Sequence, residues 1–168
     1  AYHDDLDHVA EKLRQGVSCL VECDKQLVPW FYGATRDRLR DQNAGRALRC
    51  RFVSGQPAQE NQQQGQQAGP MPSLLQLMIR QITEMVRSAE PGTVIVIPHL
   101  DLLTTTTRSG LSLEAKEVIA LVYENPEVVL LGFKDPEFEL PKTVESVFPA
   151  KRTVIGIPRD RLPRLILR

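Results

Sequence analysis

Three absences narrow the classes of protein to which this sequence can belong. The 168 residues carry 21 lysines and arginines against 21 aspartates and glutamates, so no overall field attracts the chain to nucleic acid or to a membrane surface. No apolar run approaches the ~20 residues that a membrane-spanning helix needs, and no signal peptide is visible. We therefore expect a cytoplasmic protein whose partner is neither a membrane nor a nucleic acid.

Cysteine is also scarce, which bears on both disulfides and metals. Only Cys19, Cys23 and Cys50 are present, and an odd number without metal-like pairing indicates reduced thiols. Cys19 lies in an apolar run, where a free cysteine behaves as a small hydrophobe. A zinc site needs more ligands than these three, and the histidines do not cluster near them. We expect Cys19 in the core and no bound metal.

What is present fits one compact domain over residues 1–168, because 42% of the residues are hydrophobic. Residues 55–70 break the pattern with seven glutamines and no large apolar side chain. We expect a mobile loop there, either an exposed insertion or a pore or partner loop. The first residue is alanine, and residues 159–168 resemble the start of a truncated helix or lid. We expect the chain to be part of a longer protein.

Helical and strand patterns alternate along the chain. Apolar stripes at helical spacing and short apolar or alternating runs mark the two kinds of element. We predict helices over 4–14, 28–40, 73–87 and 112–123, strands over 17–21, 48–53, 93–97, 127–131 and 153–157, and a polar loop over 104–110. This order predicts an α/β fold, a three-layer sandwich with a mostly parallel five-stranded sheet and helices on both faces. Ligands of such sheets bind at the carboxyl ends of the strands.

The second half of the chain carries three stretches with a family resemblance. They are Val128–Pro136, Leu140–Phe148 and Arg152–Pro158. They resemble the fourth strand with its sensor turn, the following turn, and the closing strand of the large α/β subdomain of AAA+ ATPases. The resemblance implies a P-loop NTPase-like sandwich, and in intact members a site for ATP and Mg²⁺ and assembly into rings.

The residues that hold phosphate and metal in that family are missing here. A phosphate loop needs glycines so that backbone N–H groups can wrap the phosphates. Residues 22–26 contain no glycine, and Lys25 is a vestige at best beside two acids. Pro98 and His99 occupy the places of the paired acids, and we expect local hydrogen bonds to satisfy His99. Asp101 matches a later acid of the family pattern that is structural or at a subunit face.

The family resemblance also points to two further positions, those of the sensor residue and of the arginine finger. Lys134 falls where family members place the sensor residue, and we expect it to pair with Asp135, Glu137 or another local acid. The family's arginine finger reaches a neighbour's γ-phosphate. Here Lys151 and Arg152 are the cations nearest to that place, so they are candidates for action on a neighbouring subunit.

Two clusters of side chains suggest contacts with other molecules. Trp30, Phe31 and Tyr32 are adjacent at a helix start and cannot all face one core, so they either form an interface or pack under the glutamine-rich loop. A basic stretch also contains six arginines, but acids interrupt it and no aromatic platform is interleaved. We predict a solvated face or a ring contact for these arginines: Arg36, Arg38, Arg40, Arg46, Arg49 and Arg51.

Together these features predict a catalytically inactive AAA+-like module. It would act as a scaffold or regulatory domain, packing against an active AAA+ domain of the same chain or of a ring neighbour. We expect no catalytic residue, no cofactor and no enzymatic activity of this domain alone, although the parent protein can be an ATPase. The alternative is a nucleotide-binding AAA+ domain with an unorthodox phosphate site, which would bind ATP and Mg²⁺ through Lys25 or Lys134.

Overall fold

The computed structural model describes residues 2–41, 43, 45–54, 73–103, 106–107 and 110–154. The predicted mobile loop at 55–70 and the predicted truncated helix at 159–168 lie outside this part. The helices are α1 (His3–Arg14), α2 (Val28–Arg40), α3 (Leu74–Arg87), α4 (Leu100–Leu103), α5 (Leu113–Glu124) and α6 (Lys142–Glu145). The strands are β1 (Cys19–Glu22), β2 (Arg49–Phe52), β3 (Thr93–Ile97), β4 (Thr106–Thr107), β5 (Gly110–Leu111), β6 (Val129–Lys134) and β7 (Ala150–Thr153).

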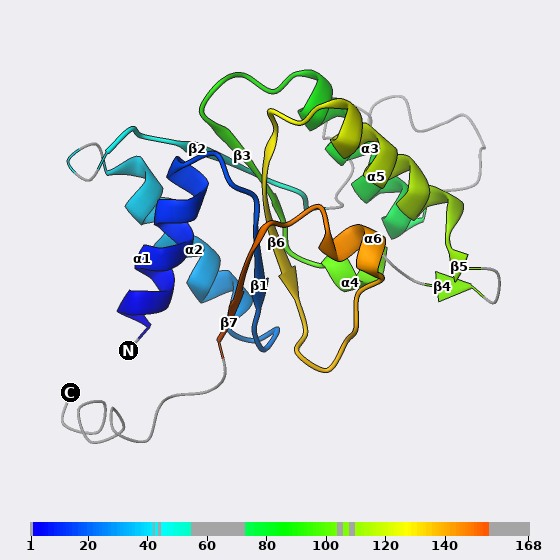
Figure 1. The fold of residues 1–168 in the computed structure, drawn as a ribbon, viewed down its shortest axis with the longest axis horizontal. Helices are drawn as coiled ribbons and strands as arrows, with labels where there is room; N and C mark the ends of the chain where they lie inside the picture. Colours follow the sequence, from blue (N-terminus) through cyan, green and yellow to red (C-terminus); the bar gives the residue numbers. More distant parts are fainter. Residues whose placement is uncertain are drawn as a thin grey trace, which may run out of the picture.

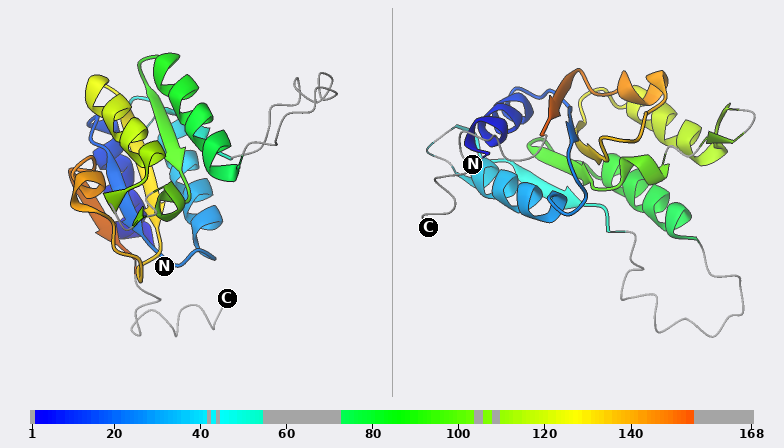
Figure 2. Two further views of the ribbon diagram at one scale, coloured as in Figure 1. Left: turned by 90° about the vertical axis from the view of Figure 1, so that its right-hand side faces the viewer. Right: turned by 90° about the horizontal axis from the view of Figure 1, so that it is seen from below.

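The predicted fold class is confirmed. Five strands form one sheet in the order β2-β3-β6-β1-β7, and every pair in it is parallel. Helices α1 and α2 cover one face, and α3 and α5 cover the other (Figures 1 and 2). Because all five strands run the same way, the segments that follow them come together at one edge of the sheet, which we call the carboxyl edge.

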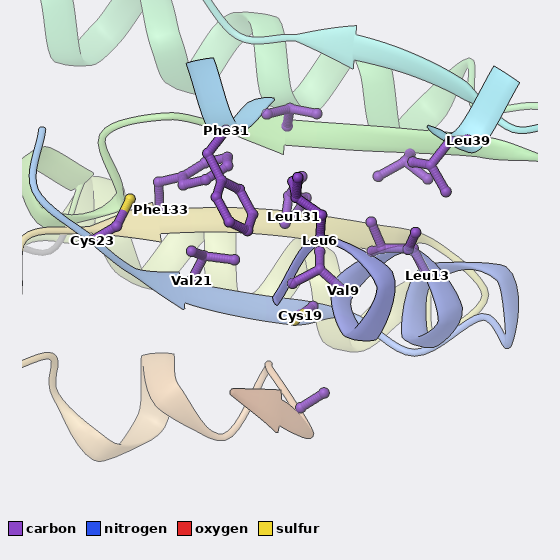
Figure 3. Packing of buried hydrophobic residues seen from close by; sticks show 14 of the residues in the cluster. Leu6, Val9, Leu13, Cys19, Val21, Cys23, Phe31, Leu39, Leu131 and Phe133 are labelled. Atoms are coloured by element: carbon purple, nitrogen blue, oxygen red, sulfur yellow. The ribbon is translucent and has the colours of Figure 1, made fainter. Parts of the chain in front are cut away.

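Alternation along the strands divides the core into two layers. Cys19 and Val21 of β1 belong to the cluster under α1 and α2, whereas Leu20 between them belongs to the cluster under α3 and α5. Figure 3 shows the first cluster, in which Phe31 of α2 stands beside Phe133 of β6 with ring centroids 6.1 Å apart. A central strand covered on both faces needs apolar residues at every position, which explains the continuous apolar run in the sequence.

Local capping signals place two helices where the sequence predicts them. Ser73 accepts a hydrogen bond from Gln76 N, and the Gln76 side chain accepts one from Ser73 N, which completes a capping box before α3. Ser112 caps α5 in the same way, accepting from Ala115 N. Both caps satisfy N–H groups that have no partner inside the helix.

Two predicted strands are displaced by a few residues. The strands predicted over 17–21 and 127–131 are Cys19–Glu22 and Val129–Lys134, respectively. In each case a residue shortly before the strand is bonded within a turn, because Val17 N donates to Lys12 O and Val128 N donates to Asn125 O. Both strands therefore reach further toward the carboxyl edge than the apolar runs alone indicate.

The last strand also begins earlier than predicted. The prediction over 153–157 is corrected to β7 at Ala150–Thr153, while residues 155–157 lie outside the described part. The alternation is hard to see because Lys151 and Arg152 stand inside the strand. Both side chains make ion pairs with other elements of the chain, so an edge strand can carry them without leaving a buried charge unpaired.

Four short elements are absent from the prediction. Where a polar loop was predicted over 104–110, Thr106–Thr107 and Gly110–Leu111 form an antiparallel pair; residues 104–105 and 108–109 are not described. The helices α4 and α6 have only four residues each. Such short pieces have too few residues to show a periodicity.

Candidate functional site

The carboxyl edge brings together the three candidate residues that the sequence singles out. Lys134 is the last residue of β6 and pairs in register with Glu22, the last residue of β1. Lys25 lies in the turn that follows β1, and Asp101 lies in α4, just after β3. Parallel strands thus collect two lysines and two carboxylates from distant parts of the sequence into one region.

Glu22 is the centre of this region. Its Oε1 lies 2.8 Å from Lys134 Nζ and 3.0 Å from Lys151 Nζ, and its Oε2 accepts a hydrogen bond of 3.0 Å from the Thr153 hydroxyl. Burial by itself raises the pKa of this carboxyl, but the donors from Lys134, Lys151 and Thr153 outweigh burial and lower the pKa to about 2. Glu22 is therefore ionised at neutral pH.

Lys134 is fully engaged by the chain itself. Its side chain is 6% exposed, and besides Glu22 its ammonium donates to the backbone carbonyl of Phe138. The acid that pairs with it is neither Asp135 nor Glu137 but Glu22 of the neighbouring strand. A buried ammonium needs such a partner, because an unpaired charge in the interior is costly.

Lys25 forms the second ion pair of the region. Its Nζ lies 2.6 Å from Asp101 Oδ2, and the lysine side chain is 45% exposed while that of Asp101 is 8% exposed. The pair links the turn after β1 to α4. From the sequence, Lys25 is interpreted as an exposed turn lysine and Asp101 as an acid that is structural or at a subunit face. Their contact is a finding of the structure.

The turn between β1 and α2 is compact and binds its own backbone groups. Gln26 N donates to Asp24 Oδ1 at 3.1 Å, and Leu27 N donates to Asp24 O at 2.9 Å. The N-cap of α2 is Leu27, which supplies no side-chain acceptor. Asp24 thus accepts the N–H groups that would have to point outward to surround a phosphate.

The turn after β3 holds no carboxylate where the family resemblance places two. Pro98 is buried and His99 is half-buried. The prediction that local hydrogen bonds satisfy His99 is wrong for one atom, because its buried Nδ1 has no hydrogen-bond partner among the described residues. The Pro98 side chain offers no ligand for Mg²⁺.

Gly132 of β6 leaves room for two side chains to pack directly against the sheet near this region. A Cβ atom at this position would lie 2.8 Å from Phe148 Cζ and 3.2 Å from Leu100 Cδ2. The sheet therefore carries a tightly packed apolar layer next to the ion pairs. The sequence gives only a weak signal for this role, namely a glycine inside an otherwise apolar strand.

The three adjacent aromatic residues at the start of α2 do not all face the core, as expected from their positions on a helix. Phe31 is fully buried, so its place in a predicted interface is corrected to the core. Trp30 is 51% exposed and contacts the Tyr2 ring, with centroids 5.7 Å apart. Tyr32 contacts Phe52 of β2, with centroids 4.9 Å apart. Of these three aromatic residues, Trp30 and Tyr32 remain candidates for an interface.

The two cations predicted to act on a neighbour are tied within this chain. Lys151 pairs with Glu22 and, at 3.4 Å, with Glu145, and these partners raise its pKa. Arg152 Nε lies 2.6 Å from Asp5 Oδ1 of α1. Because they are successive residues of a strand, they point to opposite faces of the sheet, and a neighbour would have to compete with these internal partners.

The thiols behave as core residues. Cys19 and Cys23 are buried and Cys50 is half-buried, and all three are free cysteines. Burial raises the pKa of each thiol to about 11, which keeps them protonated and poorly nucleophilic at neutral pH. Within the described ranges no group of three or more metal-ligating side chains lies together, and no described helix is long and apolar enough to cross a membrane.

Comparisons with known proteins add a limited likeness of fold. No family model and no curated protein matches the chain. A structure of C. elegans PCH-2 is similar over 99% of this chain and 44% of that chain, with a TM-score of 0.49 and 13% identity. A structure of Drosophila ORC bound to AT-rich DNA and Cdc6 is similar over 91% of this chain and 57% of that one, with a TM-score of 0.36 and 13% identity. The chain thus spans about half the length of these chains.

Proposed function

We propose that this chain is a catalytically inactive AAA+-like module that serves as a scaffold or regulatory domain of a larger ATPase protein or ring. The observation that carries this proposal is that the lysines at the carboxyl edge pair with carboxylates of the same chain. Lys134 is bound to Glu22, and Lys25 to Asp101. These acids take up the positive charge that a triphosphate would need, and they would repel its oxygens.

The rest of the region supports the same proposal. Intact phosphate sites use outward-facing backbone N–H groups, whereas the turn after β1 directs two of them to Asp24. The turn after β3 offers Pro98 and His99, and neither supplies a carboxylate for Mg²⁺. Loss of the cradle, the metal ligands and the free lysines together leaves a frame without the groups that bind and hydrolyse a nucleotide.

A scaffold also needs a surface for its partner. Trp30 is half exposed, and Tyr32 with Phe52 forms a second aromatic pair on the same side of the sheet. Aromatic side chains in such positions are enriched in protein interfaces. We propose that an active AAA+ domain, in the same parent chain or in a ring neighbour, covers this surface.

Calorimetric titration of the chain with ATP and with ADP, each with Mg²⁺, is the first experiment. We expect no saturable heat and no thermal shift on adding nucleotide that depends on the carboxyl edge, since a ligand that binds only the native state must stabilise it. Micromolar binding that Lys25→Gln or Lys134→Gln removes would overturn the proposal. It would support the alternative, a nucleotide-binding domain with an unorthodox phosphate site.

A matched control makes this experiment decisive. Lys142→Gln changes the same charge on an exposed residue of α6, away from the two ion pairs. Binding lost in all three variants would indicate a nonspecific effect of charge, and the inactive module would stand. Circular dichroism of each variant shows whether Lys134→Gln, which replaces a buried cation, still folds.

A further inference from the structure

A groove lies at the opposite edge of the sheet, where the strands begin. Two adjoining cavities of about 320 Å³ and about 470 Å³ form it. They share Arg46 and Leu48 before β2 and residues 90–93, which lead into β3. The groove is thus separate from the carboxyl edge and from its ion pairs.

The six arginines of the basic stretch divide into two sets in the structure. Three have partners within the chain: Arg38 with Asp7, Arg36 with Asp37 and the Tyr32 ring, and Arg51 with Ser88. The other three make no ion pair within the described ranges, are exposed, and line the 470 Å³ cavity together: Arg40, Arg46 and Arg49. The unpaired set is therefore collected in one place.

The backbone is shaped to seat arginines at this groove. Gly92 has a φ of +86°, and a Cβ atom there would lie 3.3 Å from Arg46 Nη2. Gly45 has a φ of +141°, and a Cβ atom there would lie 3.3 Å from Arg14 Cδ. Arg14 lines the 320 Å³ cavity and is fixed by hydrogen bonds to carbonyls at the end of α2. Glycine at both turns allows the positive φ and the close approach of an arginine side chain.

The two cavities differ in character. The smaller one has an apolar floor that includes Leu13, Leu48 and Val94, and its volume falls in the range of small-molecule sites. The larger one is rimmed by the three unpaired arginines, and Glu90 is the acid that lines it. Glu127 lines the smaller cavity. Four arginines against two glutamates leave an excess of positive charge along the groove.

We infer that this groove binds a small phosphate ester, with its apolar body in the 320 Å³ cavity and its phosphate on Arg46 and Arg49. Guanidinium groups match phosphate oxygens with paired, charge-assisted hydrogen bonds. Arg40 adds positive charge to the groove. Its position in the last turn of α2 also has a separate cause, because a cation there interacts favourably with the helix dipole. The apolar floor favours an ester over inorganic phosphate, because only an ester has a body that can be buried there.

The test uses two probes, inorganic phosphate and phenyl phosphate, followed by chemical shifts of the backbone amides. We expect saturable shifts at Leu48, Gly92 and Thr93 and none at Glu22 or Lys25. Phenyl phosphate should bind about tenfold more tightly than inorganic phosphate, because the ring buries apolar surface. Equal affinities for phenyl phosphate and inorganic phosphate would show that the groove recognises only the phosphate group. That result would overturn the assignment of an ester.

Matched double variants separate a site from general charge. Arg46→Gln with Arg49→Gln should weaken phenyl phosphate binding by about tenfold or more. Arg36→Gln with Arg51→Gln removes the same charge from outside the groove and should change the affinity less than about twofold. Equal weakening in both pairs, or no saturable shift in the wild type, would overturn the inference.

The two proposals fail separately. Shifts at Glu22 and Lys25 on adding ATP would count against the inactive module and leave the groove untouched. Nucleotide binding that Arg46→Gln with Arg49→Gln removes, and Lys134→Gln does not, would place the phosphate in the groove. That result would support the groove and leave the carboxyl edge without a ligand.

Discussion

Glu22 shows how much one side chain decides at the carboxyl edge. It receives three donors from two neighbouring strands, and it forms the ion pair of the buried Lys134. In the sequence, Glu22 is only one of the two acids in the stretch 22–26 that contains Lys25. Its partners are 112 or more residues away along the chain, so its role depends on the order of the strands.

Replacing Glu22 by Gln should destabilise the protein by about 2–4 kcal/mol at pH 7, because it leaves the buried Lys134 ammonium without its counter-charge. Urea denaturation measures this loss. Glu124→Gln, an exposed residue of α5 with no ion pair among the described residues, should change the stability by less than about 0.5 kcal/mol. Equal effects of the two variants would show that the Glu22 ion pairs contribute nothing.

The pH dependence gives an independent measure of the same group. Folding lowers the pKa of Glu22 from 4.5 to about 2, so the native state favours the ionised form. Its contribution is complete above pH 4.5 and is lost as the pH falls through that range toward 2. The wild type should therefore lose stability between pH 5 and pH 2 more steeply than Glu22→Gln. Parallel curves from urea denaturation would contradict the shift.

Gly132 carries the packing near the site. Gly132→Ala should destabilise the protein by about 1–3 kcal/mol, because the new methyl group collides with Phe148 and Leu100. Gly33→Ala is the control, since Gly33 lies within α2 and a Cβ atom there would have no neighbour within 4 Å. This second change should stabilise the protein by about 0.5–1 kcal/mol, as alanine does in a helix interior. Denaturant midpoints of the two variants should move in opposite directions.

At the scale of elements, the helices depend on signals that lie within a few residues. Ser73 and Gln76 cap α3 through reciprocal hydrogen bonds. Ser73→Ala should cost about 1 kcal/mol and speed amide exchange in the first turn of α3, whereas Ser73→Asp should restore most of the loss. Hydrogen exchange measures both. Exchange that is equally fast in Ala and Asp variants would show that the cap does not hold this end.

The difference between local and long-range signals explains which elements could be predicted from the sequence. Helices α1, α2, α3 and α5 follow apolar stripes and caps, which the sequence displays locally, and their predicted bounds hold to within a residue. The position of strand β7 depends on its pairing with β1. Its charged residues hide this position in the sequence, which is why the strand was predicted too late in the chain. The ion pairs of Lys25 and Lys134 need the parallel order of β3, β6 and β1, and no local pattern contains that order.

At the scale of the whole molecule, two core layers share one sheet. Leu13 of α1 lies in one layer and Ile82 of α3 in the other, and both are almost fully buried. The strands between them contribute alternate residues to each layer, so neither layer can lose its packing without exposing the sheet. We therefore expect one cooperative unfolding transition for the described part of the chain.

The single tryptophan makes this expectation testable. Trp30 lies on α2, and its ring contacts Tyr2, which packs against the layer that contains Leu13. We therefore use it to report on that layer. Leu13→Ala and Ile82→Ala should each cost about 2–5 kcal/mol, and each should shift the fluorescence midpoint of Trp30 and the circular dichroism midpoint by equal amounts. If Ile82→Ala moved the circular dichroism midpoint and left the fluorescence midpoint unchanged, the layers would unfold separately. One shared shift would show that the carboxyl edge belongs to a single cooperative unit.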